Sequence, residues 1–135
     1  MNHFFKRWWP AILVGAVLLI GAGYYIVVTR FVVYRCTTAD CFSALANDCR
    51  NVEYAYTNDV GSFAVSSYGC VFTKTLMTLA GENASPVKDA FEGKNLTCAY
   101  DRGSFNDSWV SSLFTGLDSC AGQLKDALNT FSTFA

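Results

Sequence analysis

The hydrophobic pattern divides the chain into one long apolar run near its start and shorter alternating segments after it. Residues 8–28 contain no charged side chain. A helix of this length spans about 31 Å, which matches the hydrocarbon core of a bilayer. Apolar residues resume after Arg30, and aromatic residues stand near both ends of the run, as at membrane interfaces. The pattern predicts a transmembrane helix over residues 8–34, after a cytoplasmic tail over residues 1–7.

A cleaved signal peptide is the competing interpretation of this segment. The residues before the apolar run are basic, and Gly21, Ala22 and Gly23 resemble a small-residue cleavage site. However, the run is longer than the core of a usual signal peptide, and cleavage there would leave an apolar N-terminus. We therefore favour an uncleaved signal-anchor.

Alternating segments in the second part of the chain predict an antiparallel sheet. Residues 52–57 alternate large apolar side chains with smaller or polar ones, and residues 62–68 and 70–80 are rich in apolar and β-branched residues. Asn58, Asp59, Gly61 and Gly69 supply the turns between these segments. The simplest arrangement is a three-stranded meander, to which residues 94–100 add a fourth strand.

Helical segments surround this predicted sheet. Residues 41–49 predict a short helix capped by Asp40, Ser85 and Pro86 open a second, and residues 107–114 predict a third that Gly116 stops. The clearest helical spacing follows a cap at Asp118 or Ser119. It is carried by Cys120, Leu124, Ala127, Leu128 and Phe131. The fold class predicted for residues 36–135 is therefore α+β, a sheet of about four strands with packed helices and a C-terminal amphipathic helix.

All six cysteines follow the apolar run, and an even number in a small domain indicates disulfides. They are Cys36, Cys41, Cys49, Cys70, Cys98 and Cys120. Disulfides persist in oxidising compartments. Because the basic residues on the two sides of the run are nearly balanced, the cysteines decide the orientation, with the N-terminus cytoplasmic and the C-terminal domain extracytoplasmic.

The pairing of the cysteines is narrowed but not fixed by the sequence. A helix over residues 41–49 would hold Cys41 and Cys49 about 12 Å apart, beyond the reach of a disulfide. Six cysteines allow fifteen pairings. Among these we expect Cys98 to pair with Cys120, and Cys49 to pair with Cys70 and tie the first helix to the sheet.

Charge and composition exclude some functions for the outer domain. Residues 36–135 carry eleven acidic and six basic residues, a net charge of −5, which disfavours nucleic acids and anionic headgroups. The only histidine is His3, so this domain has no imidazole for catalysis or metal binding. The sequence contains no known catalytic motif and no CxxC pair. We expect no cofactor, no metal and no enzymatic activity.

Two weaker patterns remain. Asp101, Gly103, Asn106 and Asp107 place oxygen ligands near a glycine, but their spacing does not match an EF-hand, and a turn explains them better. Three N-x-S/T triplets mark candidate glycosylation sites. They begin at Asn83, Asn95 and Asn106.

The segments EGKNLTCAY and LFTGLDSCAGQLKDAL, at 92–100 and 113–128, resemble a pattern in uncharacterised, single-anchor, cysteine-containing proteins of archaea and candidate-phylum bacteria. The resemblance covers roughly the last third of the chain. It implies an extracytoplasmic α+β domain with no known activity, and it assigns no functional residues.

The leading functional hypothesis is a membrane-anchored, extracytoplasmic binding or assembly protein at the cell surface, with a protein partner or a second copy of itself. A short tether would hold the domain near partners in the same membrane at high effective concentration. Two alternatives stay open. One is a small hydrolase that uses two of the eleven carboxylates, and the other is a secreted effector, should the N-terminal segment be cleaved.

Overall fold

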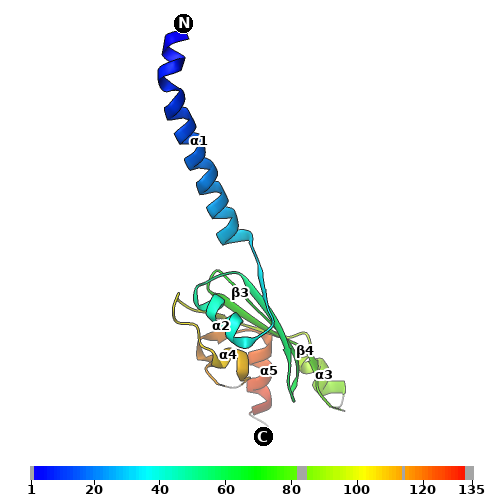
Figure 1. Ribbon diagram of the computed structural model, residues 1–135. Coiled ribbons are helices and arrows are strands. Elements are labelled where there is room, and N and C mark those ends of the chain that lie inside the picture. Colours follow the sequence, from blue (N-terminus) through cyan, green and yellow to red (C-terminus); the bar gives the residue numbers. More distant parts are fainter. Residues whose placement is uncertain (1, 82–84, 114, 133–135) are drawn as a thin grey trace. The chain divides into compact units, whose positions relative to one another are not determined.

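The chain folds into two compact units, Met1–Val32 and Val33–Ala135. A computed structural model describes residues 2–81, 85–113 and 115–132, and gives the backbone alone at residues 2–11, 29–30, 85 and 131–132. The first unit is the helix α1, Asn2–Phe31 (Figure 1).

Helix α1 differs from the predicted membrane helix in both bounds. It begins before residue 8, and the prediction that it continues to Tyr34 is wrong. Two β-branched residues, Val32 and Val33, follow the helix, and Tyr34 donates a backbone hydrogen bond to Asn51 instead. Among the described residues, no helix has both the length and the hydrophobicity needed to cross a membrane. The predicted anchor at residues 8–34 is therefore unsupported here and stays a prediction from the sequence.

The second unit is built on a six-stranded sheet with the order β1-β2-β3-β4-β5-β6. The strands are β1 Tyr34–Cys36, β2 Val52–Thr57, β3 Gly61–Tyr68, β4 Val71–Leu79, β5 Asn95–Ala99 and β6 Cys120–Ala121. Strand β1 runs parallel to β2, and every other neighbouring pair is antiparallel. The predicted meander and fourth strand are confirmed, whereas the all-antiparallel sheet of about four strands is corrected to a mixed sheet of six.

Within the described residues of this unit, five helical segments join and cover the strands. They are α2 Ala39–Asn47, α3 Ser85–Phe91, α4 Ser108–Ser111, the 3₁₀ turn η1 Leu117–Ser119, and α5 Gln123–Ser132. The α+β class is confirmed. The cap of α2 is Thr38, whose hydroxyl accepts from the backbone N–H of Cys41, so the expected cap at Asp40 is wrong; Asp40 lies in the first turn.

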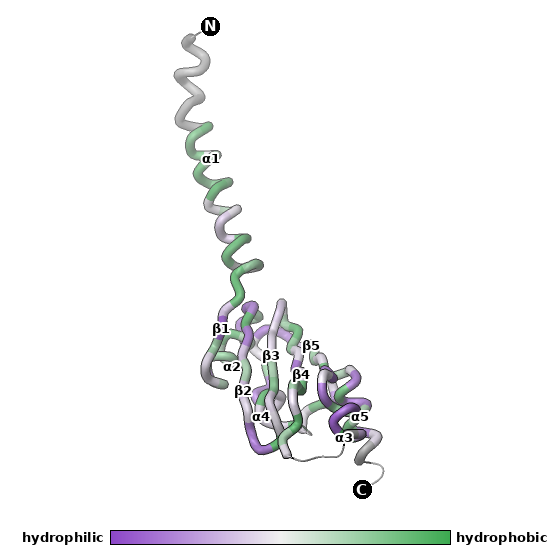
Figure 2. The backbone as a smooth tube through the Cα atoms, turned by 90° about the vertical axis from the view of Figure 1, so that its right-hand side faces the viewer, coloured by the Kyte–Doolittle hydropathy of each residue, from purple (hydrophilic) through white to green (hydrophobic). Residues whose placement is uncertain are grey.

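One face of the sheet packs on helices and forms the core. Alternate residues of the central strands, Phe63, Val65, Phe72 and Leu76, are buried there, as the alternating pattern predicts. Opposite them lie Phe42 and Ala46 of α2, Trp109 and Val110 of α4, and Leu124 and Leu128 of α5. Helix α3 packs near the far end of β4, where the Glu92 side chain accepts from the backbone N–H of Leu79. The intervening residues of β3 and β4, Ala64, Ser66, Thr73 and Thr75, are less buried and lie on the opposite face. Figure 2 colours the backbone of both strands by residue hydropathy.

Three disulfides brace this unit, and no cysteine is free. The expected pairs Cys49–Cys70 and Cys98–Cys120 are confirmed, and Cys36 pairs with Cys41 across five residues. The predicted position of Cys120, at the start of the last helix, is wrong. Cys120 lies in β6, opposite Cys98 of β5. Three disulfides indicate an oxidising environment for the domain.

Candidate binding site on the open face of the sheet

The open face of the sheet is hollow because its central positions carry small side chains. In register across the sheet stand Glu53, Ser66, Thr73 and Thr97, and the next row is Ala55, Ala64, Thr75 and Asn95. The result is an open groove of about 710 Å³, a volume within the range of ligand sites. It is lined by Arg35, Cys36, Thr37, Glu53, Tyr54, Ala55, Ala64, Val65, Ser66 and Thr75.

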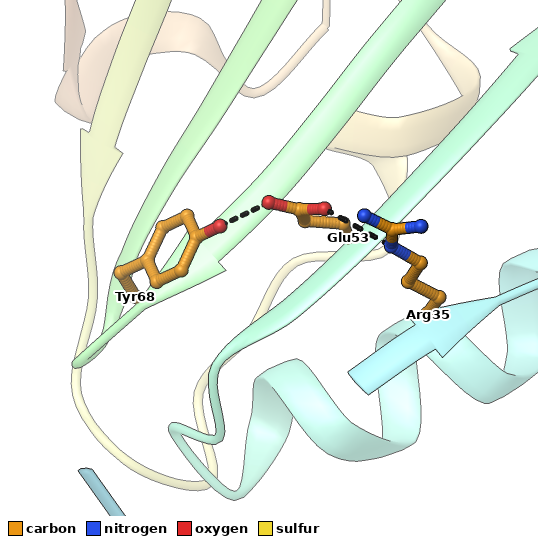
Figure 3. Close-up of polar contacts among 3 residues, drawn as sticks. All are labelled: Arg35, Glu53 and Tyr68. Atoms are coloured by element: carbon orange, nitrogen blue, oxygen red, sulfur yellow. Dashed lines mark hydrogen bonds and ion pairs between the residues drawn. The ribbon is translucent and has the colours of Figure 1, made fainter. Parts of the chain in front are cut away.

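Three polar side chains stand in a line at one end of this groove (Figure 3). Arg35 of β1 forms an ion pair with Glu53 of β2, with 3.8 Å between Nε and Oε2. The other carboxylate oxygen of Glu53 accepts a hydrogen bond from the hydroxyl of Tyr68, at the end of β3. This hydrogen bond is the main reason why the pKa of the Tyr68 phenol is raised. Glu53 is therefore held between a guanidinium and a phenol.

Arg35, Glu53 and Tyr68 form the rim of the groove, and their exposure determines which contacts they can make. The Arg35 side chain is 88% exposed, so most of its guanidinium donors face solvent. An ion pair this exposed contributes little to stability. The rim can therefore offer hydrogen bonds to a partner, together with the seryl and threonyl hydroxyls of the groove floor.

Beneath the groove, on the core side of the sheet, lies a buried cation that the sequence prediction missed. Lys74 of β4 is 1% exposed. Its Nζ donates to the backbone oxygens of Trp109, Val110 and Ser112 at 3.1, 3.0 and 3.0 Å, and it lies 4.9 Å from the centre of the Phe63 ring. Burial lowers the pKa of Lys74 to about 8. The signal was available, because Lys74 occupies an inward position in the alternation of β4.

Tyr56 shares one acceptor with this lysine. Its hydroxyl also donates to the backbone oxygen of Val110. Burial, with a smaller contribution from Tyr54, raises the pKa of Tyr56 to about 12. Both donors are thus directed at the carbonyl groups of α4 and the residues after it, an arrangement that holds this segment to the sheet. The geometry is that of a structural support, since the ammonium faces three protein acceptors.

Of the predicted site residues, Cys36 lines the groove, whereas the candidate glycosylation residues are not among its lining residues. Asn95 and Asn106 are exposed, which is compatible with glycosylation, and Asn83 lies outside the described residues. The side chain of Asn106 accepts from the backbone N–H of Ser108, which confirms the turn interpretation at Asn106, whereas Asp107 makes no side-chain cap hydrogen bond. Among the described residues there is no group of three or more side chains able to hold a metal.

Comparisons with protein-family models, with curated proteins and with solved structures find no match to this chain. The resemblance drawn from residues 92–100 and 113–128 stays a prediction.

Proposed function

We propose that this chain is a membrane-anchored, extracytoplasmic binding or assembly protein. Residues 1–7 would lie in the cytoplasm, the uncharged part of α1 from residue 8 to residue 28 would hold the protein in the membrane, and the disulfide-braced unit would lie outside. The observation that carries this proposal is a helix with exposed aliphatic side chains followed directly by a fully disulfide-paired domain. Leu18, Leu19 and Ile20 are each at least 67% exposed. Apolar surface of this extent is stable when lipid or another protein covers it.

Binding is favoured over hydrolysis by the composition of the groove. Carboxylate-based hydrolysis of glycosides needs two facing carboxyl groups about 5 to 10 Å apart. The groove lining contains one carboxylate, Glu53, which is already engaged by Arg35 and Tyr68. An open surface of small side chains instead suits contact with another protein, because a partner can approach the backbone closely.

Photo-crosslinking in intact membranes tests this proposal. A photoreactive residue would replace Ala64 on the groove floor, and a matched variant would carry it at Ala44, an exposed alanine of α2. We expect a crosslinked partner or dimer from position 64 and none from position 44. A full chain that remains monomeric and uncrosslinked at position 64 in its own membrane would remove the proposal.

N-terminal sequencing of the mature protein separates the anchored form from a secreted effector. The anchored form retains its first residues, apart from the initiator methionine. Cleavage after Ala22 or Gly23 would instead support the effector interpretation.

A further inference from the structure

All three arginines of the second unit lie at the end of the sheet where the chain enters β1. Arg35 is in β1 itself, and the guanidinium of Arg50 lies 6.0 Å from the ring centre of Tyr34, the first residue of β1. Arg102 donates to the backbone oxygen of Asp48, two residues before Arg50. The lysines lie elsewhere: Lys74 is buried, Lys88 is in α3, Lys94 precedes β5 and Lys125 is in α5.

Exposed apolar side chains share this end with the arginines. The strand register places the start of β1 and the turn between β3 and β4 together, because Tyr34 pairs with Val52 and Val52 pairs with Ser67. The turn is flanked by Tyr68 and Val71, which are 42% and 39% exposed. Val33, just before β1, is 42% exposed. We name this surface, made of Val33, Arg35, Arg50, Tyr68, Val71 and Arg102, the arginine end.

The arginine end has the composition of a membrane–water interface. Tyrosine rings prefer the headgroup layer, and a guanidinium binds phosphate through paired hydrogen bonds with little loss of hydration. Glu53 offsets one of the three positive charges of this surface through the ion pair with Arg35, whereas Arg102 donates to the backbone oxygen of Asp48. The arginine end is thus a local cationic surface on a domain that is acidic as a whole, and its guanidinium groups suit the phosphate of a zwitterionic headgroup.

The connection between α1 and the arginine end is short. Only Val32 and Val33 separate the last residue of α1 from the first residue of β1, a span of about 10 Å at full extension. We infer that the arginine end rests in the phospholipid headgroup layer of the bilayer that holds α1. This inference rests on the proposed function, because it requires α1 in the membrane.

Paramagnetic broadening by a lipid-attached nitroxide tests the inference on the unmodified full chain. The protein would be placed in phosphatidylcholine nanodiscs with the nitroxide at the headgroup, and the intensity of each backbone amide NMR signal would be measured. We expect strong attenuation for the amides of Tyr68, Gly69 and Val71. The matched comparison is the opposite end of the sheet, where Val60 and Met77 are 42% and 54% exposed. Their amides should keep their intensity.

The result also separates the inference from the proposed function. If α1 is attenuated but the arginine end is attenuated no more than Val60 and Met77, the inference is overturned and the anchor stands. If neither α1 nor the arginine end is attenuated, both are overturned.

A double variant tests the role of the two exposed side chains. Tyr68→Ser with Val71→Ser should lower the affinity of the arginine end for lipid by about tenfold. The amide signal of Gly69 should then regain intensity. Val60→Ser with Met77→Ser is the control, and it should leave the pattern unchanged. Unchanged attenuation in the Tyr68 and Val71 variant would contradict the inference.

Discussion

At the scale of single residues, Lys74 carries a charged group that is buried in the core. An ammonium group loses its hydration in the core, and three backbone oxygens from Trp109, Val110 and Ser112 replace the lost water. No carboxylate is among these acceptors. The lysine therefore holds the segment after α4 through hydrogen bonds to neutral carbonyl groups, and it depends on their geometry.

Removing this donor should destabilise the domain. Lys74→Met keeps the length of the side chain but leaves the carbonyl groups without their shared donor, and we expect a loss of about 2 to 4 kcal/mol in the free energy of unfolding. Urea unfolding measures this loss. Lys88→Met on α3, where the lysine is only partly buried, should change the free energy by less than about 0.5 kcal/mol. Equal effects of the two substitutions would contradict the role given to Lys74.

The pKa of Lys74 predicts a dependence of stability on pH. Its pKa is about 8 in the folded domain and 10.5 ordinarily, so between these values the unfolded chain binds more protons. The free energy of unfolding should therefore rise with pH above 8, by about 3 kcal/mol at most. Above pH 10, Tyr56 should lower the free energy of unfolding as the pH rises, because its pKa is raised to about 12 in the folded domain. The free energy of unfolding, measured from pH 8 to 10, should rise for the native chain and stay constant for Lys74→Met. Parallel curves would show that another group titrates.

At the scale of elements, the strand periodicity of the sequence predicted β2 to β5 correctly, together with the order of the β2–β3–β4 meander. Alternation is a local signal, and each of these strands packs one face on the core. The strands at the two edges could not be predicted in this way. β1 and β6 have three and two residues, too few for a pattern, and their pairing depends on distant partners.

Dependence on a distant partner also explains why the position of Cys120 was predicted wrongly. Residues 118–131 show helical spacing, yet α5 begins at Gln123. Cys120 and Cys98 face each other on neighbouring strands and are joined by a disulfide, so tertiary structure overrides the local preference there. The groove was also beyond prediction, because it arises where small residues of three strands come into register.

Two glycines of the strand turns should respond differently to substitution. A Cβ at Gly61 would lie 2.1 Å from the backbone oxygen of Thr78 across the β3–β4 pair, so Gly61→Ala must displace a strand. We expect a loss of about 3 kcal/mol or more. Gly69 has a φ of +57° and open space around it, so Gly69→Ala should cost only about 1 kcal/mol. Thermal unfolding of both variants measures the difference, and a reversed order would contradict the described register.

At the scale of the whole molecule, the disulfides compensate for the modest size of the outer unit. Cys49–Cys70 and Cys98–Cys120 close loops of 21 and 22 residues, and Cys36–Cys41 closes one of 5. The entropy of the unfolded chain predicts losses of about 3 kcal/mol when either long loop is opened and about 2 kcal/mol for the short one. Paired cysteine-to-serine variants, compared by urea unfolding, test this order. A short-loop variant that unfolds more easily than both long-loop variants would show that another effect dominates.

The proposed topology has a helix in the membrane and an oxidised, disulfide-paired domain on its outer side. Thiol labelling of intact cells that express the full chain tests this most directly, with a membrane-impermeant maleimide applied before and after a membrane-impermeant reductant. We expect no labelled cysteine before reduction, and after it labelling first at Cys41, Cys49 and Cys70, which are less buried than Cys36, Cys98 and Cys120. Cysteines that react without reduction, and only once the cells are permeabilised, would contradict it.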